Sequence, residues 1–245
     1  MIPKIIHYCW FGRNPLPASA LKCIESWKRY LPGYEIVEWN EDNFDVREIP
    51  YVAQAYDAGK YAFVSDYARF WVLHNYGGLY FDTDVEVVAP MDDILESGPY
   101  MGMEKTLSGD IAVNPGLGFA AESGMEALEK LLEMYSRLRF RNADGSLNQT
   151  TIVKHTTDIL AQYGYIHEDK LQQCAGFQIY PVEYFCPLDY RTGKLAKTAN
   201  TRTIHHYAST WHTWKDKWIR LKRVFFSEDQ IRKISAFLDR FRKRA

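Results

Sequence analysis

Two aspartates in an otherwise apolar segment restrict most strongly how this chain can fold. Asp82 and Asp84 follow the apolar residues 79–81 and precede residues 85–88, three of which are valines. Burying two carboxylates there costs several kcal/mol each unless a hydrogen bond, an opposite charge or a cation compensates them. No turn signal follows the pair. The sequence therefore favours a strand end or bulge that holds a divalent cation over a solvated polar turn.

The residues before this pair predict a helix that leads into a strand. Ser65 is a favourable N-cap, and residues 67–76 keep a helical period. Gly77 and Gly78 supply the stop, and residues 79–81 then read as a short strand. We expect a helix of about three turns.

The first forty residues predict an alternation of strand and helix. Residues 2–10 form an apolar run, residues 18–30 have a helical period, and residues 34–39 alternate between apolar and polar. Strand, helix, strand in this order is typical of a βαβ unit with parallel strands. The predicted class is α/β with a mostly parallel sheet.

Composition supports one compact globular body. The 245 residues are 47% hydrophobic and carry 30 basic against 31 acidic side chains, so no net field draws the molecule to nucleic acid. The four cysteines form no Cys-x-x-Cys pair and read as reduced thiols. No apolar run is long enough to span a membrane, and the first residues read as a strand and not as a signal peptide. We predict a cytoplasmic protein.

The C-terminal residues have a different character. We predict a catalytic domain over residues 1–212 and a helical extension over residues 213–245. Residues 215–245 contain eleven basic and four acidic side chains, and an apolar helical stripe runs through Ile231, Ile234, Phe237, Leu238 and Phe241. Two hypotheses stay open. The helix lies on an anionic membrane at the inner face of the plasma membrane, or it packs on protein.

The chemistry of the aspartate pair admits several enzyme classes. Carboxylate oxygens select Mg²⁺ or Mn²⁺, which proteins commonly hold together with substrate phosphates. A nucleotidyltransferase, a phosphatase and a glycosyltransferase all remain compatible. Glu86 stands where an Asp-x-Asp-x-Thr phosphatase needs Thr or Val, and no P-loop motif is present.

Three strings in order along the chain resemble one enzyme family. They are IPKIIHYCWFG, SDYARFWVLHNYGGLYFDTDVEV and HHYASTW, and they resemble glycosyltransferase family 32, whose members carry a DXD sugar-binding region. The large clostridial glucosylating toxins are similar at a greater distance. The resemblance implies a GT-A fold, a nucleotide-diphosphate sugar donor and Mn²⁺ or Mg²⁺. It also implies a retaining transfer of a hexose or N-acetylhexosamine to a glycan or lipid-linked glycan in cell-surface polysaccharide synthesis.

For the donor we favour a UDP-sugar, with GDP-mannose behind it. The alternative function is a nucleotide-sugar hydrolase that uses no glycan acceptor.

The resemblance assigns roles to four charged residues. It implies that Asp84 binds the metal directly, while Asp82 contacts ribose or sugar and reaches the ion through water. Asp66 and Arg69 would hold the sugar and the phosphates of the donor. They lie three residues apart on a helix, a spacing that an ordinary surface ion pair shares.

The resemblance also implies roles for aromatic residues and for a histidine. Trp10 would stack on the base, Tyr8 or Cys9 would offer backbone groups to it, and Tyr80 would line the nucleotide pocket. Core roles compete for Trp10 and Tyr80. The metal is assigned to His206, because neighbouring residues of a strand point to opposite sides, which leaves His205 a core or surface role.

The remaining assignments concern the sugar and the diphosphate. Ser209 and Trp211 would complete the coordination shell and the contact with the leaving diphosphate. Asn114 and Asp110 would contact the sugar, and residues 148–158 would border the acceptor or simply pack. For the chemical step, front-face attack is favoured over double displacement through Asp110.

Overall fold

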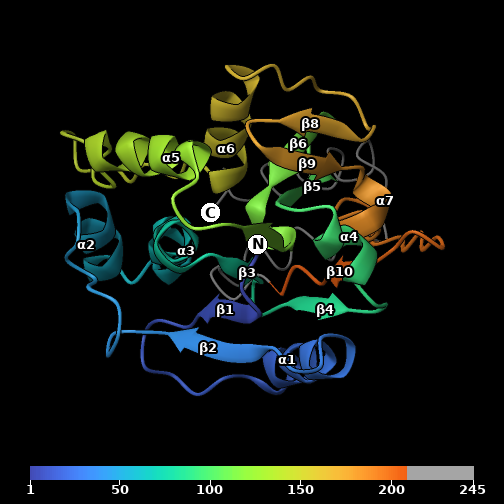
Figure 1. Ribbon diagram of the computed structural model, residues 1–245. Helices are drawn as coiled ribbons and strands as arrows, with labels where there is room; N and C mark the ends of the chain where they lie inside the picture. Colours follow the sequence, from blue (N-terminus) through green and yellow to red (C-terminus); the bar gives the residue numbers. More distant parts are fainter. Residues whose placement is uncertain (209–245) are drawn as a thin grey trace, which may run out of the picture.

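The computed structural model describes residues 1–208 (Figure 1). The strands are β1 (Ile5–Cys9), β2 (Glu35–Trp39), β3 (Gly78–Tyr80), β4 (Val85–Val87), β5 (Tyr100–Lys105), β6 (Ile111–Asn114), β7 (Phe119–Ala121), β8 (Gln172–Cys174), β9 (Phe177–Tyr180) and β10 (Thr203–His205). The helices are α1 (Ala18–Tyr30), α2 (Pro50–Asp57), α3 (Tyr61–Tyr76), α4 (Asp92–Glu96), α5 (Glu126–Arg137), α6 (Ile152–Ala161), α7 (Val182–Phe185) and the 3₁₀ turn η1 (Pro115–Leu117).

Eight of these strands form one sheet in the order β2-β1-β3-β7-β5-β9-β8, with β6 paired to β5 beside this path. Strand β1 pairs in parallel with β2 and β3, and β5 pairs in parallel with β9. Strand β7 runs antiparallel to both of its neighbours. Strands β1, β2, β3, β5 and β9 therefore share one direction, and the predicted α/β class with a mostly parallel sheet is confirmed.

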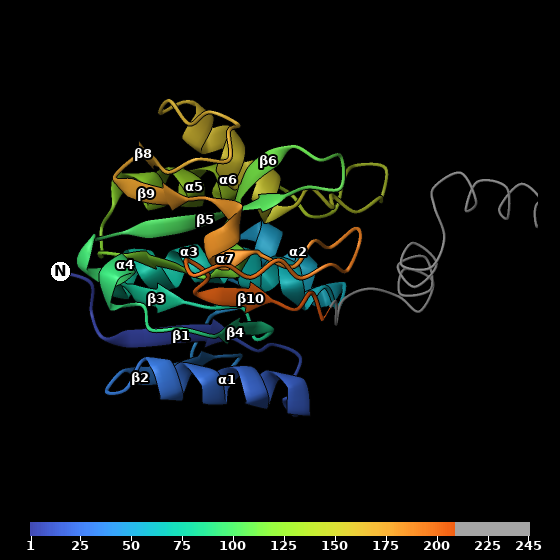
Figure 2. The same ribbon diagram turned by 90° about the vertical axis from the view of Figure 1, so that its right-hand side faces the viewer.

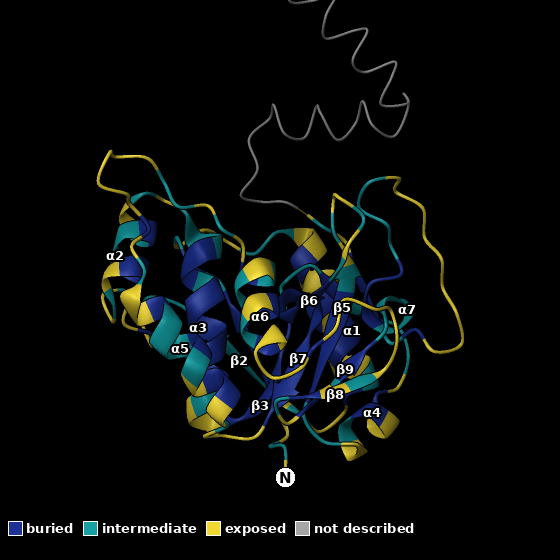
Figure 3. Ribbon diagram, turned by 90° about the horizontal axis from the view of Figure 1, so that it is seen from above, coloured by how far each residue is buried: buried dark blue, intermediate teal, exposed yellow. Residues whose placement is uncertain are grey.

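Helices cover both faces of this sheet (Figures 1 and 2). On one face, α2, α3, α5 and α6 enclose a core that contains Phe70, Phe119 and Tyr135. On the other face, α1, α4 and α7 enclose a second core around Trp27 and Phe185. Helix α3 is largely buried beside the sheet (Figure 3), so polar side chains on it are held in fixed positions.

The β1-α1-β2 unit agrees with the sequence, whereas α3 begins earlier than expected. Helix α3 starts at Tyr61, so Ser65 lies inside it, and the Ser65 hydroxyl donates to the Tyr61 carbonyl at 3.2 Å. The prediction of Ser65 as N-cap is wrong because buried Phe63 and Val64 extend the packed face of the helix. Gly77, at φ 66°, ends the helix as expected.

The aspartate pair lies in a turn that leads out of the sheet. The Val85 N–H donates to the Asp82 carbonyl at 3.0 Å, and β4 then pairs antiparallel with β10 and not with the main sheet. His205 stands opposite Val85 in this two-stranded ribbon. The pairing brings the end of the described chain next to the aspartates (Figure 2).

Within residues 1–208, no helix has both the length and the apolar character that crossing a bilayer requires. The expected domain boundary at residue 212 and the cationic helix of residues 213–245 lie outside the described residues.

Candidate active site

A cavity of about 910 Å³ opens where β1, β3 and β5 end, at the carboxyl edge of the parallel strands. Ligands in α/β proteins commonly bind at this edge. Residues from eight separate parts of the described chain converge on the cavity. Its lining includes Trp10, Asp66, Arg69, Asp82, Asp84, Glu104, Asn114, Thr151, Ile152, Tyr190, His205 and Tyr207.

Arg69 connects α3 to the aspartate turn. Its Nη2 lies 3.0 Å from Asp66 Oδ1, and its Nη1 lies 3.2 Å from Asp82 Oδ2. The guanidinium carbon lies 4.8 Å from the centre of the Tyr80 ring, and the arginine side chain is only 4% exposed. The alternative of an ordinary surface ion pair is therefore wrong. Arg69 is a buried charge that fixes both carboxylates.

Negative charge exceeds positive charge around this arginine. Burial raises the pKa of Asp66 to about 7, the Asp82 charge adds to this rise, and Arg69 opposes it. The Tyr80 hydroxyl donates to Asp82 Oδ1 at 3.2 Å. A single guanidinium thus serves two carboxylates, an arrangement that a further cation would stabilise.

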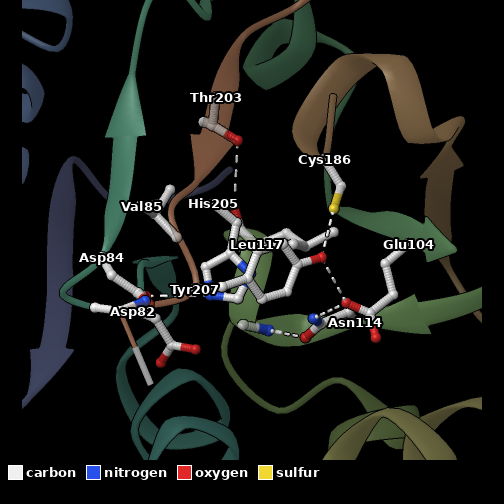
Figure 4. Close-up of polar contacts among 12 residues, drawn as sticks. Asp82, Asp84, Val85, Glu104, Asn114, Leu117, Cys186, Thr203, His205 and Tyr207 are labelled. Carbon is white, nitrogen blue, oxygen red and sulfur yellow. Dashed lines mark hydrogen bonds and ion pairs between the residues drawn. The ribbon is translucent and has the colours of Figure 1, made fainter. Parts of the chain in front are cut away.

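Asp84 is held by the end of the described chain (Figure 4). Its Oδ1 lies 3.1 Å from His205 Nε2, and its Oδ2 accepts the Ala208 N–H at 2.7 Å. Burial disfavours the charge of Asp84, but His205 and the Ala208 N–H outweigh burial and lower its pKa. Burial likewise opposes the imidazolium of His205, and Asp84 raises its pKa. The two form an ion pair at the cavity wall.

The assignment of the metal to His206 is corrected by this geometry. The His206 imidazole lies 2.8 Å from Glu86 on the outer side of the ribbon and is 44% exposed. Adjacent residues do point to opposite sides, as expected. Thr203 and His205 lie two residues apart on β10 and therefore share one face. This face is the inner one, because the Thr203 hydroxyl donates to the buried carbonyls of Leu117 and Phe185.

Asp82, Asp84 and His205 together fit a divalent cation. Their potential ligand atoms all lie within 4.8 Å of one another. Two carboxylate oxygens and one imidazole nitrogen suit Mn²⁺, and the oxygens suit Mg²⁺. Binding through His205 Nε2 would require loss of its proton, because a metal-bound imidazole nitrogen carries none.

The predicted aromatic residues divide between the cavity and the core. Trp10 lines the cavity, and its indole N–H donates to the Asn14 carbonyl at 2.6 Å. The Tyr8 side chain points to the opposite face of the sheet, where its hydroxyl donates to Glu38 at 2.6 Å. Tyr80 lies beneath Arg69 and does not line the cavity, so it acts on the site through Asp82.

The two predicted sugar contacts behave differently. Asn114 lines the cavity, its Oδ1 accepts the Gly116 N–H at 2.7 Å, and its Nδ2 donates to Glu104 at 2.8 Å. Asp110 is exposed on the β5–β6 hairpin, is absent from the lining, and accepts the Ser108 hydroxyl. The structure does not bring Asp110 into the cavity of Asp82 and Asp84, although residues 105–108 of the same hairpin line it. Ser209 and Trp211 lie outside the described residues.

Two cavity residues, Glu104 and Tyr207, were not predicted from the sequence. Glu104 ends a strand whose sequence shows only an apolar run, and no motif marks it. Tyr207 has φ 50°, and its ring centre lies 4.1 Å from that of His205. Positive φ at a bulky residue is uncommon, but the sequence alone does not reveal it.

Comparison with known proteins identifies the region around this site. Residues 17–100 match a family model described as the glycosyltransferase sugar-binding region containing the DXD motif. Inositol phosphoceramide mannosyltransferase 3 of Schizosaccharomyces pombe is 33% identical over 38% of this chain and 27% of its own length. Mannosyl phosphorylinositol ceramide synthase CSH1 of Saccharomyces cerevisiae is 25% identical over 47% of this chain and 33% of its own. The chain thus matches about a third of the length of these relatives.

Solved structures with related architecture include two glycosyltransferases. PaToxG glycosyltransferase is 18% identical, with a TM-score of 0.49 over 66% of this chain and 69% of that one. A glycosyltransferase involved in glycosylation of the major capsid of PBCV-1 is 12% identical, with a TM-score of 0.48 over 91% and 98%. Likeness at this level assigns neither substrate nor mechanism. The resemblance to the DXD glycosyltransferases is confirmed by the family match over residues 17–100.

Proposed function

We propose that this chain, which carries the DXD sugar-binding region of a glycosyltransferase over residues 17–100, is a metal-dependent glycosyltransferase that uses a nucleotide-diphosphate sugar. One observation carries the proposal. Asp82, Asp84 and His205 form a cation-sized cluster inside a cavity of about 910 Å³. Such a cavity lies in the size range of small-molecule sites.

The lining suggests how the donor lies. The diphosphate would face the cluster of Asp82, Asp84 and His205, where a bound Mn²⁺ or Mg²⁺ would supply positive charge next to the leaving group. The base would lie towards Trp10, and the sugar towards Asn114. Arg69 holds the Asp82 carboxylate in a fixed orientation through their 3.2 Å ion pair.

In the proposed step, the bond between the anomeric carbon and the β-phosphate oxygen breaks, and a bond from that carbon to an acceptor hydroxyl oxygen forms. The hydroxyl proton passes to the departing phosphate, and the electron pair of the broken bond stays on that phosphate. Attack from the side of the leaving group retains the anomeric configuration. Double displacement through Asp110 has no support, because Asp110 does not line the cavity.

The relatives bear on the donor and the acceptor. Several of them are named as mannosyltransferases that act on inositol phosphoceramide. These names support a hexosyl donor, and we therefore propose GDP-mannose alongside the UDP-sugars favoured by the sequence. We keep a glycan or lipid-linked glycan of cell-surface polysaccharide as the proposed acceptor, and a cytoplasmic location with it.

Incubation of the protein with UDP-glucose, UDP-galactose, UDP-N-acetylglucosamine or GDP-mannose, with and without Mn²⁺, tests the proposal. We expect transfer to an oligosaccharide or lipid-linked glycan acceptor with one donor, and a loss of at least about 100-fold in the Asp84→Asn variant at unchanged circular dichroism. Wild-type turnover by that variant would refute the metal site. Release of free sugar without any glycoside, with acceptors present, would favour the hydrolase instead.

A further inference from the structure

Glu104 is a cavity carboxylate that neither the DXD motif nor the family match covers, since the matched segment ends at residue 100. It lies at the carboxyl end of β5, in the central part of the sheet. Its Oε2 accepts two hydrogen bonds, from Asn114 Nδ2 at 2.8 Å and from the Tyr207 hydroxyl at 3.3 Å. Within residues 1–208, its Oε1 has no hydrogen-bond partner.

These contacts are part of a series of side-chain contacts along the cavity wall. Asp84 contacts His205, the ring of His205 lies against that of Tyr207, and the hydroxyl of Tyr207 reaches Glu104. Figure 4 shows Glu104 and Asn114 on the far side of the Tyr207 ring from the two aspartates. The side chains of His205 and Tyr207 therefore link Asp84 to Glu104.

From Asn114 the chain of contacts returns to the aspartates. Asn114 Oδ1 accepts the Gly116 N–H, and a Cβ at Gly116 would lie 3.2 Å from Arg69 Nη1 and would collide with the carboxylate of Asp82. The backbone of η1 at Gly116 thus packs closely against Asp82, Asn114 and Arg69. Glu104 and Asn114 line the same cavity as Asp82, Asp84 and His205, and a sugar bonded to a cluster-bound diphosphate would lie in this cavity.

We propose that Glu104 is the residue that recognises the donor sugar, with Oε1 accepting a hydrogen bond from a sugar hydroxyl. This inference rests on the proposed function. Ionised carboxylates are acceptors only, and their hydrogen bonds to hydroxyl groups are short and strong. Asn114 and Tyr207 both donate to Oε2, so Oε1 is the oxygen of this cavity-lining carboxylate that a ligand would use.

The electrostatics of Glu104 fit this role. Burial raises the pKa of Glu104 although Asn114, His205 and Tyr207 all favour its charged form. A buried carboxylate with too few donors is poorly stabilised. A sugar hydroxyl would supply the missing donor, and a nucleoside diphosphate without its sugar would not.

The test compares two ligands in one variant. Titration calorimetry with Mn²⁺ measures the affinity of the nucleotide sugar that the wild type binds best and of the corresponding nucleoside diphosphate. In Glu104→Gln we expect nucleotide-sugar affinity to fall about 10- to 100-fold and nucleoside-diphosphate affinity to change less than about threefold. Glu86→Gln, which alters a carboxylate outside the cavity, is the matched control and should change neither affinity.

Several results would overturn the inference. An equal loss of affinity for both ligands would mean that Glu104 only maintains the structure of the cavity wall. Unchanged affinities with lost turnover would mean that Glu104 acts on the anomeric carbon and does not recognise the sugar. If Glu104→Gln does not fold, Glu104→Asp takes its place. Its shorter side chain should weaken the nucleotide sugar selectively, and equal effects on both ligands would contradict the inference. A wild type that binds nucleoside diphosphates but no nucleotide sugar would refute the proposed function itself.

Discussion

At the scale of single residues, this site is governed by the cost of buried charge. Arg69 stands between Asp66 and Asp82, and His205 stands beside Asp84, so each of these three carboxylates has a cationic neighbour. Removing one member of such a group leaves an uncompensated charge. Substitution of a side chain that faces the cavity should therefore lower ligand affinity, whereas substitution of its neighbour in the sequence, which faces outwards, should have little effect.

Two adjacent histidines offer the most direct comparison. We expect His205→Gln to lower Mn²⁺-dependent affinity for UDP or GDP about 10- to 100-fold, because it removes a side chain at the cation cluster. His206→Gln should change this affinity less than about threefold, because its pair with Glu86 is half exposed. Calorimetric titration measures both variants, and the reverse order of effects would restore the assignment to His206.

A glycine pair separates damage to the site from damage to the fold. In Gly116→Ala, the added methyl group would collide with Asp82 and lie 2.9 Å from Asn114 Oδ1. We expect donor affinity to fall about 10- to 100-fold, because displacement of site groups by about 1 Å has effects of that order.

The matched variant is Gly102→Ala, whose methyl group would meet Phe185 at 2.9 Å in the core. Its free energy of unfolding should fall by about 1–3 kcal/mol, while the folded protein keeps donor affinity within about threefold. Denaturant titration and calorimetry together distinguish the two variants. Equal loss of affinity in both would contradict a local role for Gly116.

At the scale of secondary-structure elements, the site depends on how strands are joined. His7 on β1 contacts the carbonyl of Gly77, which ends α3, at 3.0 Å, and it accepts the indole N–H of Trp39 on β2 at 3.0 Å. Trp27 on α1 donates its indole N–H to the Val85 carbonyl on β4 at 2.7 Å. Single buried hydrogen bonds thus fix the two elements that flank the aspartate turn.

The junction at His7 predicts a dependence of stability on pH. Burial lowers the pKa of His7 to about 4, against the opposing effect of the Gly77 carbonyl. Because the unfolded chain takes up the proton near pH 6.5, this contribution to stability is complete above pH 6.5 and is lost as the pH falls towards 4. The loss amounts to about 2 kcal/mol by pH 5.

In His7→Gln, which has no titrating imidazole, we expect a smaller fall in the free energy of unfolding between pH 7 and pH 5. Urea titrations at the two pH values measure the difference. A fall as large as that of the wild type would show that other groups dominate.

At the scale of the whole molecule, the sheet and the β4–β10 ribbon together build the cavity. Residues from the first strand to the end of the described chain contribute to its lining. A ligand that contacts such distant segments binds only the native state, and it therefore stabilises the entire fold.

We expect Mn²⁺ together with UDP or GDP, at about 100 times the dissociation constant, to stabilise the protein by about 2.7 kcal/mol, which corresponds to a rise in Tm of about 5–10 °C. Mn²⁺ alone should produce a smaller rise, EDTA should reverse the effect, and Asp84→Asn should abolish it. Scanning calorimetry provides the measurement. An equal rise without Mn²⁺ would contradict a shared metal and diphosphate site.

The sequence by itself determined the local elements and the position of the acidic pair. The hydrophobic periods located β1, α1 and β2, and the apolar setting of Asp82 and Asp84 indicated a cation, because these features depend on neighbours along the chain. Only the tertiary structure decided that His205 and not His206 faces the aspartates, that Asp110 lies outside the cavity, and that Glu104 lies within it. The two-residue period of a strand shows that neighbours diverge, but the inward face depends on the partner strand and its register. Such pairings join β4 to residues more than a hundred positions away.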